Sequence, residues 1–169
     1  MIDKMIEYRV ATSKDLEKIW DMNISDNPND KRWLNWKQKY IDYNLVKKAV
    51  TFVVVINGKP IGEGTLLLNP DCDAVKGKNC LVDGKNIANV NALRIRKEHE
   101  GQGHISKIIK LMEEFAINNG IKTLTIGVEA KETRNLAIYL HWGFDSFIFN
   151  ETEDGELILY FKKELKKQY

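Results

Sequence analysis

Cysteine is scarce in this sequence, which has only Cys72 and Cys80 among its 169 residues. Their spacing matches no common zinc-binding pattern and there is no second pair, so the sequence predicts no structural zinc site. Two cysteines are also too few for the disulfide framework that stabilises many small secreted domains. We therefore expect two free thiols in a reducing compartment.

Long apolar runs and an excess of one charge are absent as well. No apolar segment approaches the roughly 20 residues that a membrane-spanning helix needs, and the N-terminal segment lacks the apolar core of a secretory signal. The 26 lysines and arginines are nearly balanced by 24 aspartates and glutamates, for a net charge of +2, whereas nucleic-acid-binding domains usually have a strong basic excess. We expect a cytoplasmic protein that has neither a membrane nor a nucleic acid as its partner.

The rest of the composition is typical of one globular domain. Hydrophobic residues make up 43% and charged residues 30%, which provides enough apolar surface for a packed core. A length of 169 residues fits one domain, and no internal repeat, low-complexity linker or change of composition divides it. Residues 1–169 are therefore predicted to form a single domain.

The N-terminal part of the chain predicts a strand and two helices. Residues 7–11 have the pattern of a short strand, and Thr12 with Asp15 forms a capping box at the start of a helix. A second helix is predicted over residues 31–44. It carries three aromatic residues at helical spacing, which are Trp33, Trp36 and Tyr40. Aromatic residues at this spacing usually pack into a core, and the alternative is that they line a binding pocket.

The middle of the chain predicts three strands. Residues 50–56 are an almost unbroken β-branched and aromatic run, which is typical of a buried strand. The dipeptide Asn57-Gly58 is a strong hairpin signal, so residues 61–68 should form the return strand. A third strand is expected over residues 87–96.

The remaining segments alternate helices and strands. The clearest element is a helix predicted over residues 103–119, where apolar residues recur at helical spacing. The other predicted segments are a loop over 69–84, a strand over 124–128, a helix capped by Thr133 and ending at Gly143, and a hairpin of residues 144–150 and 157–163 across a turn at 151–155. The order β-α-α-β-β-β-α-β-α-β-β indicates a mixed α/β (α+β) domain.

A strand, a glycine-containing turn and an amphipathic helix follow one another between residues 92 and 109. Such a turn leaves backbone N–H groups free at the positive end of a helix dipole, and Gly101 and Gly103 allow a ligand to approach the backbone closely. This arrangement favours a bound phosphate or pyrophosphate. The P-loop pattern and the dinucleotide pattern G-x-G-x-x-G are both missing, and in many such turns glycine serves the geometry alone.

The end of this strand and the loop after it have a recognisable pattern. The strand ends in Leu93-Arg94-Ile95, and residues 100–105 are Glu-Gly-Gln-Gly-His-Ile before the helix begins. The pattern is similar to the pyrophosphate loop of the GNAT superfamily of N-acetyltransferases. In that family a strand ending in L-x-V precedes R-G-x-G-[IVA]-[GA] and a long helix.

A second motif follows in the order and spacing of the same family. After their next strand, GNAT proteins have N-x-x-A-x-x-L-Y-x-K-x-G-F. In this chain Ile138, Tyr139, Gly143 and Phe144 occupy corresponding positions. Two motifs in the right order are more specific than either alone, and the chain resembles the family in motif over residues 89–144.

The resemblance implies a fold and an activity. The fold is a mixed, mostly antiparallel sheet of six to seven strands flanked by helices, with a central parallel strand pair that splays apart near Ile95 and Val128. The activity is transfer of the acetyl group of acetyl-CoA to a primary amine by direct attack, with no metal. The acceptor is a small molecule or a peptide, and the protein is a monomer or a homodimer.

The resemblance also assigns residues to this chemistry. The cofactor-binding positions are Leu93, Ile95, Glu100, Gly101, Gln102, Gly103, His104, Ile105, Ser106, Asn135 and Tyr139. Within this set, the backbone N–H of Ile95 would face the thioester oxygen, and Tyr139 would protonate the departing thiolate.

The general base is not marked by the family pattern. GNAT proteins often have a glutamate on the strand before L-x-V, where this chain has Asn89 and Asn91, which can hold a water but cannot act as bases. Glu63 on the neighbouring predicted strand is the best carboxylate candidate, and Glu129 is a weaker one. Charged strand residues are mostly exposed, so a solvated Glu63 is the more frequent arrangement.

Two loop residues depart from the family pattern and leave alternatives open. Glu100 replaces an Arg or Gln, and Ile105 replaces a Gly or Ala next to the cofactor. A non-catalytic acyl-CoA-binding or regulatory domain of the same fold is therefore a second hypothesis. An interaction module without a cofactor is a third, and turnover of acetyl-CoA with any amine would exclude both.

Overall fold

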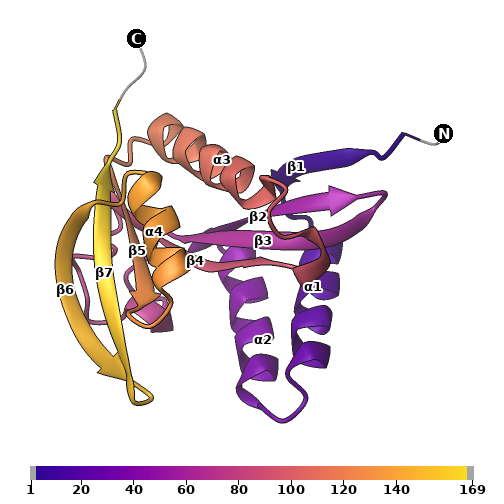
Figure 1. Ribbon diagram of the computed structural model, residues 1–169, viewed down its shortest axis with the longest axis horizontal. Coiled ribbons are helices and arrows are strands. Elements are labelled where there is room, and N and C mark those ends of the chain that lie inside the picture. The colour runs from indigo at the N-terminus through magenta and orange to yellow at the C-terminus, as the bar shows by residue number, and fades with distance from the viewer. Residues whose placement is uncertain (1–2, 167–169) are drawn as a thin grey trace. The chain divides into compact units, whose positions relative to one another are not determined.

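The protein is a mixed α+β structure of seven strands and four α-helices within residues 3–166, which are the residues that the computed structural model describes (Figure 1). The elements are β1 Ile6–Val10, α1 Ser13–Asp26, α2 Arg32–Leu45, β2 Ala49–Ile56, β3 Lys59–Leu67, β4 Ile87–Ile95, α3 His104–Asn118, β5 Thr123–Glu129, α4 Thr133–His141, β6 Ser146–Glu153 and β7 Glu156–Glu164. The strands hydrogen-bond in the order β1-β2-β3-β4-β5-β7-β6. The predicted fold class and order of elements are confirmed.

The chain packs as two compact units. The first contains the described residues up to Leu66 together with Ala92–Met112, and the second contains Leu67–Asn91 and the described chain from Glu113 onward. Strand β4 and helix α3 each have residues in both units.

The first unit is built on the strands β1, β2 and β3 and the C-terminal part of β4. Strands β1 and β2 pair antiparallel, with Arg9 opposite Val53. The hairpin between β2 and β3 turns at Asn57 and Gly58, whose φ angles of 49° and 80° are those of the predicted two-residue turn. Helices α1 and α2 lie side by side on one face of these strands, and the start of α3 lies on the other (Figure 1).

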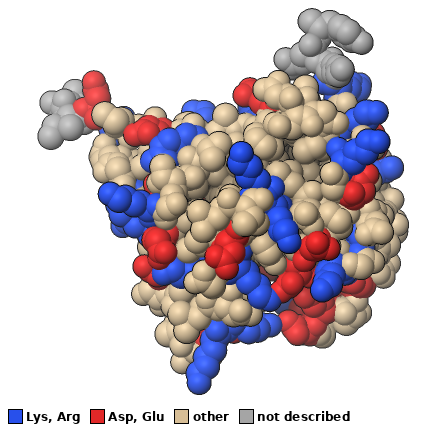
Figure 2. Space-filling view, turned by 180° about the vertical axis from the view of Figure 1, so that it is seen from behind, with Lys and Arg blue, Asp and Glu red and all other residues tan. Residues whose placement is uncertain are grey.

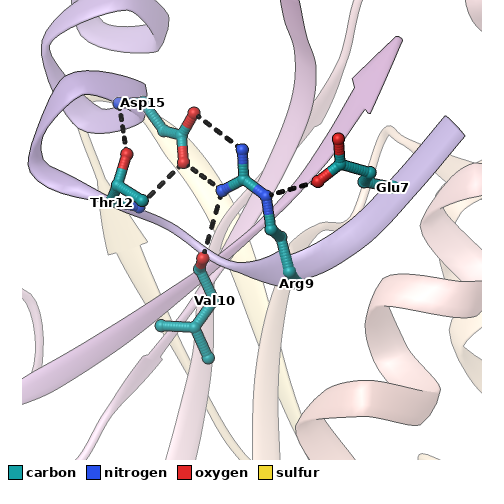
Figure 3. A network of polar contacts seen from close by, with 5 residues as sticks. All are labelled: Glu7, Arg9, Val10, Thr12 and Asp15. Carbon is teal, nitrogen blue, oxygen red and sulfur yellow. Dashed lines mark hydrogen bonds and ion pairs between the residues drawn. The ribbon is translucent and has the colours of Figure 1, made fainter. Parts of the chain in front are cut away.

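The start of α1 is fixed by the predicted capping box and by an arginine from β1 (Figure 3). The Thr12 hydroxyl accepts from the Asp15 N–H at 3.2 Å, and the Asp15 carboxylate accepts from the Thr12 N–H at 2.7 Å. Arg9 donates to both oxygens of this carboxylate and to Glu7. Burial raises the pKa of Asp15, but the hydrogen bonds from Arg9 and Thr12 outweigh it and hold the pKa below its usual value.

We expect Asp15→Asn to lower the free energy of unfolding by about 1–2 kcal/mol at pH 7, because it replaces one of the two accepting oxygens with an NH2 group and removes the charge that Arg9 binds. The folded-state pKa lies below that of the unfolded chain, so this contribution is full at neutral pH and is lost as the pH falls below about 4. Denaturant unfolding at pH 7 and pH 3 measures both effects. The exposed Asp145→Asn is the control, and an equal loss for Asp15→Asn at both pH values would contradict the network's role.

The second unit is centred on β5. Its parallel register with β4 runs from Ile87 opposite Thr123 to Val90 opposite Ile126, and stops there although β4 continues to Ile95. Strand β7 pairs antiparallel with β5 along the whole length of β5, and it pairs with β6 on its other side. The parallel pairing therefore covers only the N-terminal part of β4.

Two local predictions for the second unit were wrong. The last hairpin turns at Asp154-Gly155, with φ angles of 50° and 78°, so β6 extends through Glu153 into the predicted five-residue turn and β7 begins directly after it, at Glu156. An Asp-Gly pair tolerates positive φ at both positions, which permits this tight connection. The N-terminal cap of α4 is Glu132 without a side-chain hydrogen bond, and Thr133 is the first helical residue.

The predicted loop before β4 contains one short helical turn, Asp73–Val75, and buries several apolar side chains. Cys72 is buried and Cys80 is exposed, and both are free thiols, as expected. Within residues 3–166 no helix has the length and apolarity to cross a membrane. Figure 2 shows Lys and Arg interspersed with Asp and Glu on the face in view, without a uniformly basic region.

Candidate functional site

Two glycines on β3 set the contact between β3 and the C-terminal part of β4. The Arg96 N–H donates to the Ile61 carbonyl at 2.9 Å, which places Gly62 and Gly64 opposite Ile95 and Leu93. A Cβ on Gly62 would lie 2.7 Å from Cδ1 of Ile95, and one on Gly64 would lie 2.8 Å from Cδ1 of Leu93. Any larger residue at these positions would therefore have to displace the ends of these side chains on this face of the sheet.

The backbone of β4 is unusual immediately before Leu93. Ala92 has a φ of 52°, in the left-handed region that non-glycine residues rarely adopt. Such residues occur at bulges, which redirect the side chains and N–H groups that follow them. The predicted thioester-facing residue, Ile95, follows Ala92 by three residues.

Glu63 lies between the two glycines and its side chain is on the opposite face from theirs, because side chains alternate along a strand. It is fully buried, so the expected solvated arrangement was wrong. Its Oε2 accepts from the Asn23 amide of α1 at 3.1 Å, whereas its buried Oε1 has no hydrogen-bond partner among the residues that the structure describes. Burial raises the pKa of Glu63, and the attraction of Arg94 and the Asn23 bond offset this only in part.

Arg94 is the cation closest to Glu63, with Nη2 3.7 Å from its Oε1. The guanidinium carbon lies 5.0 Å from the ring centroid of Trp20 on α1 and 4.9 Å from that of Trp33 on α2. The buried Nε of Arg94 has no acceptor in the described chain. Glu63, Arg94 and the two indoles therefore form one polar and aromatic cluster beneath α1 and α2, which we call the Glu63–Arg94 cluster.

The predicted pyrophosphate loop lies in the same unit and has the required backbone geometry. Gly101 and Gly103 have φ angles of 73° and 82°, and a Cβ on either would meet nothing within 4 Å. Helix α3 begins at His104. In the described part of the chain, the backbone N–H groups of residues 101–106 have no acceptor. They are a set of donors at a helix N-terminus, where an anion is favoured.

His104 is buried where the loop enters α3. The Tyr8 hydroxyl lies 2.7 Å from its Nδ1, and the Gln102 side-chain oxygen lies 3.1 Å from its Nε2. Burial lowers the pKa of His104, and the nearby His99 and Lys107 lower it further. This imidazole therefore anchors the loop to β1 as a neutral group near neutral pH.

The remaining loop positions are more open. Glu100 and Gln102 are exposed, whereas Ile105 and Ser106 are half-buried in the first turn of α3. No ion pair joins Glu100 to another described residue, so nothing in the structure prevents its carboxylate from turning to solvent.

Asn89 and Asn91 lie on the N-terminal part of β4, which belongs to the second unit. Asn89 is buried and donates to the Thr125 hydroxyl at 3.0 Å, and this hydroxyl donates to the Leu81 carbonyl at 2.9 Å. Asn91 donates to the Asn89 side-chain oxygen at 3.5 Å. These amides thus hold β4, β5 and the preceding loop together within this unit.

The other predicted residues of the second unit lie on α4. Tyr139 is half-buried and stacks on Trp142, with ring centroids 5.8 Å apart. Burial raises the pKa of Tyr139, and the negative charge of Glu132 raises it further. Within residues 3–166 its hydroxyl has no hydrogen-bond partner. Asn135, one turn earlier, is exposed.

The structure thus brings Glu63, Leu93 and Ile95 together in the unit that also carries the glycine loop. Arg94, Trp20 and Asn23 belong to this cluster and are not among the residues predicted from the sequence. Alternation on β4 gives a signal for Arg94, because it must lie on the face opposite Leu93 and Ile95. The sequence left open whether Trp33 packs into the core or lines a binding pocket. In the structure Trp33 is half-buried in the cluster.

A sequence profile of the acetyltransferase (GNAT) family matches residues 14–144. The match covers most of the chain and includes the glycine loop and the Tyr139 motif. The chain therefore belongs to the GNAT acetyltransferase family and is an acyltransferase. Among curated proteins, none matches the chain significantly.

Solved structures of similar fold agree with this assignment. The structure of yncA from Salmonella typhimurium with its cofactor acetyl-CoA has a TM-score of 0.71 at 12% identity, covering 98% of this chain and 96% of that one. A ribosomal-protein-alanine N-acetyltransferase from Brucella melitensis gives 0.70 at 15%, covering 94% and 99%. A spermidine N-acetyltransferase SpeG chimera from Vibrio cholerae and hSSAT gives 0.69 at 15%, covering 95% and 95%. Similarity at these identities establishes the shared fold.

Proposed function

We propose that this protein transfers the acetyl group of acetyl-CoA to a primary amine by direct attack. The observation that carries the proposal is the buried Glu63 carboxylate on the strand beside Leu93–Ile95, whose Oε1 accepts no hydrogen bond from the described residues. The same unit presents the free N–H groups of the glycine loop. A proton acceptor and an anion site on adjoining elements are what amine acylation from a CoA thioester requires.

The residues present fit acetyl-CoA. The N–H groups of residues 101–106 would hold its pyrophosphate, and the absence of atoms near the Gly101 and Gly103 Cβ positions leaves the backbone open to it. Lys107, exposed on the first turn of α3, adds positive charge there. Bound acetyl-CoA supplies a thioester with an acyl carbon open to attack. The exposed Glu100 and the half-buried Ile105 do not remove any of these backbone donors.

Ile95 supports this chemistry through its backbone. Because the Arg96 N–H points to β3, and N–H groups alternate sides along a strand, the Ile95 N–H points away from β3. In the proposal it donates to the thioester oxygen. One such donor contributes roughly 2.7–4 kcal/mol to transition-state stabilisation in other acyl-transfer enzymes.

Glu63 and Tyr139 divide the proton transfers. An alkyl ammonium, with a pKa of about 10.4, must lose a proton before it attacks, and Glu63 accepts that proton directly or through one water. Its raised pKa brings it closer to the operating pH of a general base. Tyr139 donates a proton to the departing thiolate, and its raised pKa keeps its hydroxyl protonated at neutral pH.

We further propose that the two units act as one N-acetyltransferase domain in the cytoplasm. Strand β4 and helix α3 run through both units, and the family match draws on both. The exposed free thiol of Cys80 is in keeping with a reducing compartment.

Acetyl-CoA and CoA at about 100 times their Kd should raise the Tm by roughly 5–10 °C, since such binding adds about 2.7 kcal/mol of stability. Gly103→Val should abolish this shift, because the side chain intrudes on the donor loop and opposes its positive φ. Gly77→Val is a matched control: Gly77 has a φ of 79° and an equally empty Cβ position in another loop. It should melt earlier and still show the full shift. Thermal denaturation with acetyl-CoA, CoA and ATP measures this, and an equal response to ATP or none to acetyl-CoA would contradict the loop's role.

A further inference from the structure

We propose that Arg94 binds a carboxylate on the acceptor, so that the amine acetylated is that of an α-amino acid or a close analogue. This inference rests on the proposed acetyl transfer and names its acceptor class. The sequence pattern leaves the acceptor open, and the family match does not restrict it.

The hydrogen-bonding state of Arg94 is the first support. A guanidinium has five N–H donors, and in the described chain none of those of Arg94 makes a hydrogen bond. Among residues 3–166 its one ionic partner is Glu63, which is 3.7 Å away, beyond hydrogen-bonding distance. A buried donor without an acceptor is costly, and a carboxylate satisfies two guanidinium donors at once.

The arrangement of the cluster is the second support. Trp20 and Trp33 contact the guanidinium and fix it in place, while part of the Arg94 side chain reaches the surface. The indoles pack against the guanidinium and offer it no acceptor, so its donors are available to a ligand. Because the guanidinium is already held in one orientation before the ligand binds, the entropy cost of binding a planar anion is lower.

Charge complementarity is the third support. The cluster has two unsatisfied atoms of opposite kind, the acceptor Oε1 of Glu63 and the donor Nε of Arg94. An α-amino acid has an ammonium next to a carboxylate, so it presents a donor to Glu63 and an acceptor to Arg94. A polyamine presents only cations, which Arg94 repels. The cluster therefore favours the amino acid over a polyamine.

The test compares α-amino acids with their carboxamides as acceptors, and spermidine as a purely cationic one. The product is the N-acetyl compound measured by mass spectrometry. We expect kcat/KM for the preferred acid to exceed that for its carboxamide and for spermidine by about 10²-fold, since one charge-assisted contact is lost. The carboxamide is a strict comparison, because its amine is less basic and more often neutral at the assay pH.

Arg94→Gln should raise KM for the acid by about 10²-fold, leave the carboxamide within a few-fold, and so remove the preference. Arg94→Lys should restore it only in part, since ammonium lacks the planar fork. Arg96→Gln is the matched control, because Arg96 lies two residues along, has the same side-chain exposure of 28%, and is paired with Asp26 and Glu98. It should keep the preference. A purely structural Arg94 would affect acid and carboxamide equally, and that result would overturn the proposal.

The outcomes separate this inference from the proposed function. Efficient acetylation of spermidine or of carboxamides by the wild-type protein would overturn the proposal that Arg94 binds a carboxylate of the acceptor, and it would still support the proposed acetyl transfer. If no amine is acetylated, the proposed function fails. Binding of the carboxylate by Arg94 is then tested by tryptophan fluorescence during titration with the amino acids in the presence of CoA. Quenching that Arg94→Gln abolishes would support carboxylate binding by Arg94, and no quenching in the wild type would overturn that proposal.

Discussion

Glu63→Gln is expected to lower kcat/KM for amine acetylation by about 10²–10³-fold at pH 7, because the amide keeps the shape of the side chain and cannot accept a proton. The Asn23 amide can still donate to the glutamine oxygen, so the packing of α1 on β3 is retained. Acetyl-CoA binding should be unchanged, since the loop N–H groups are not altered. Steady-state kinetics with a thermal-shift titration on the same preparation separates the two.

The dependence of kcat/KM on pH tests the role of Glu63 as the base most specifically. Activity should rise with pH as Glu63 loses its proton, and burial places that rise above the ordinary glutamate range. The Glu63→Gln variant should lack this acidic limb. Glu129→Gln is the control, because Glu129 is a half-exposed carboxylate paired with Lys131. Full activity with an unchanged acidic limb in Glu63→Gln would exclude Glu63 as the base.

Tyr139→Phe should lower kcat by about 10²-fold and leave the acetyl-CoA affinity nearly unchanged, because it removes only the proton donor for the thiolate. The stacking of the ring on Trp142 is retained in phenylalanine. Since burial and Glu132 raise the pKa of the wild-type phenol, the activity that depends on it should persist well into the alkaline range.

Tyr43→Phe on α2 is the control for loss of a phenol. Tyr43 is half-buried like Tyr139, but it lies in the first unit and Tyr139 lies in the second. An acyl donor with a more acidic thiol needs less protonation, so it should reduce the defect of Tyr139→Phe. If Tyr139→Phe has wild-type kcat with acetyl-CoA, Tyr139 is a packing residue of α4.

Much of the fold was predictable because its determinants are local. The capping box at Thr12 and Asp15 and the turn at Asn57-Gly58 each specify a backbone conformation within four residues, and both are confirmed. The last hairpin was predicted with the wrong turn because Glu151–Glu153 are polar and resemble a loop. Their pairing with β7 and the short Asp154-Gly155 connection outweigh that composition.

The candidate site was predictable in its loop and not in its cluster. The loop depends on consecutive residues, from Gly101 to the start of α3, so a motif finds it. The burial of Glu63 depends on a helix 40 residues away in sequence, through Asn23. It also depends on the face of β4 that Arg94 occupies after Ala92, whose φ is positive. A single sequence gives no register between β3 and β4, so these contacts required the structure. The catalytic roles stay predictions.

The central claim is that this chain acetylates an amine with acetyl-CoA, and the most direct measurement is mass spectrometric detection of the N-acetylated product from a panel of amines. A mass readout is preferable to thiol titration because the exposed Cys80 would react with the reagent. We predict acetyl-CoA-dependent product with at least one α-amino acid, lost in Glu63→Gln and retained in Glu129→Gln. Binding of acetyl-CoA without any product across the panel would contradict the claim and identify a non-catalytic acyl-CoA-binding protein.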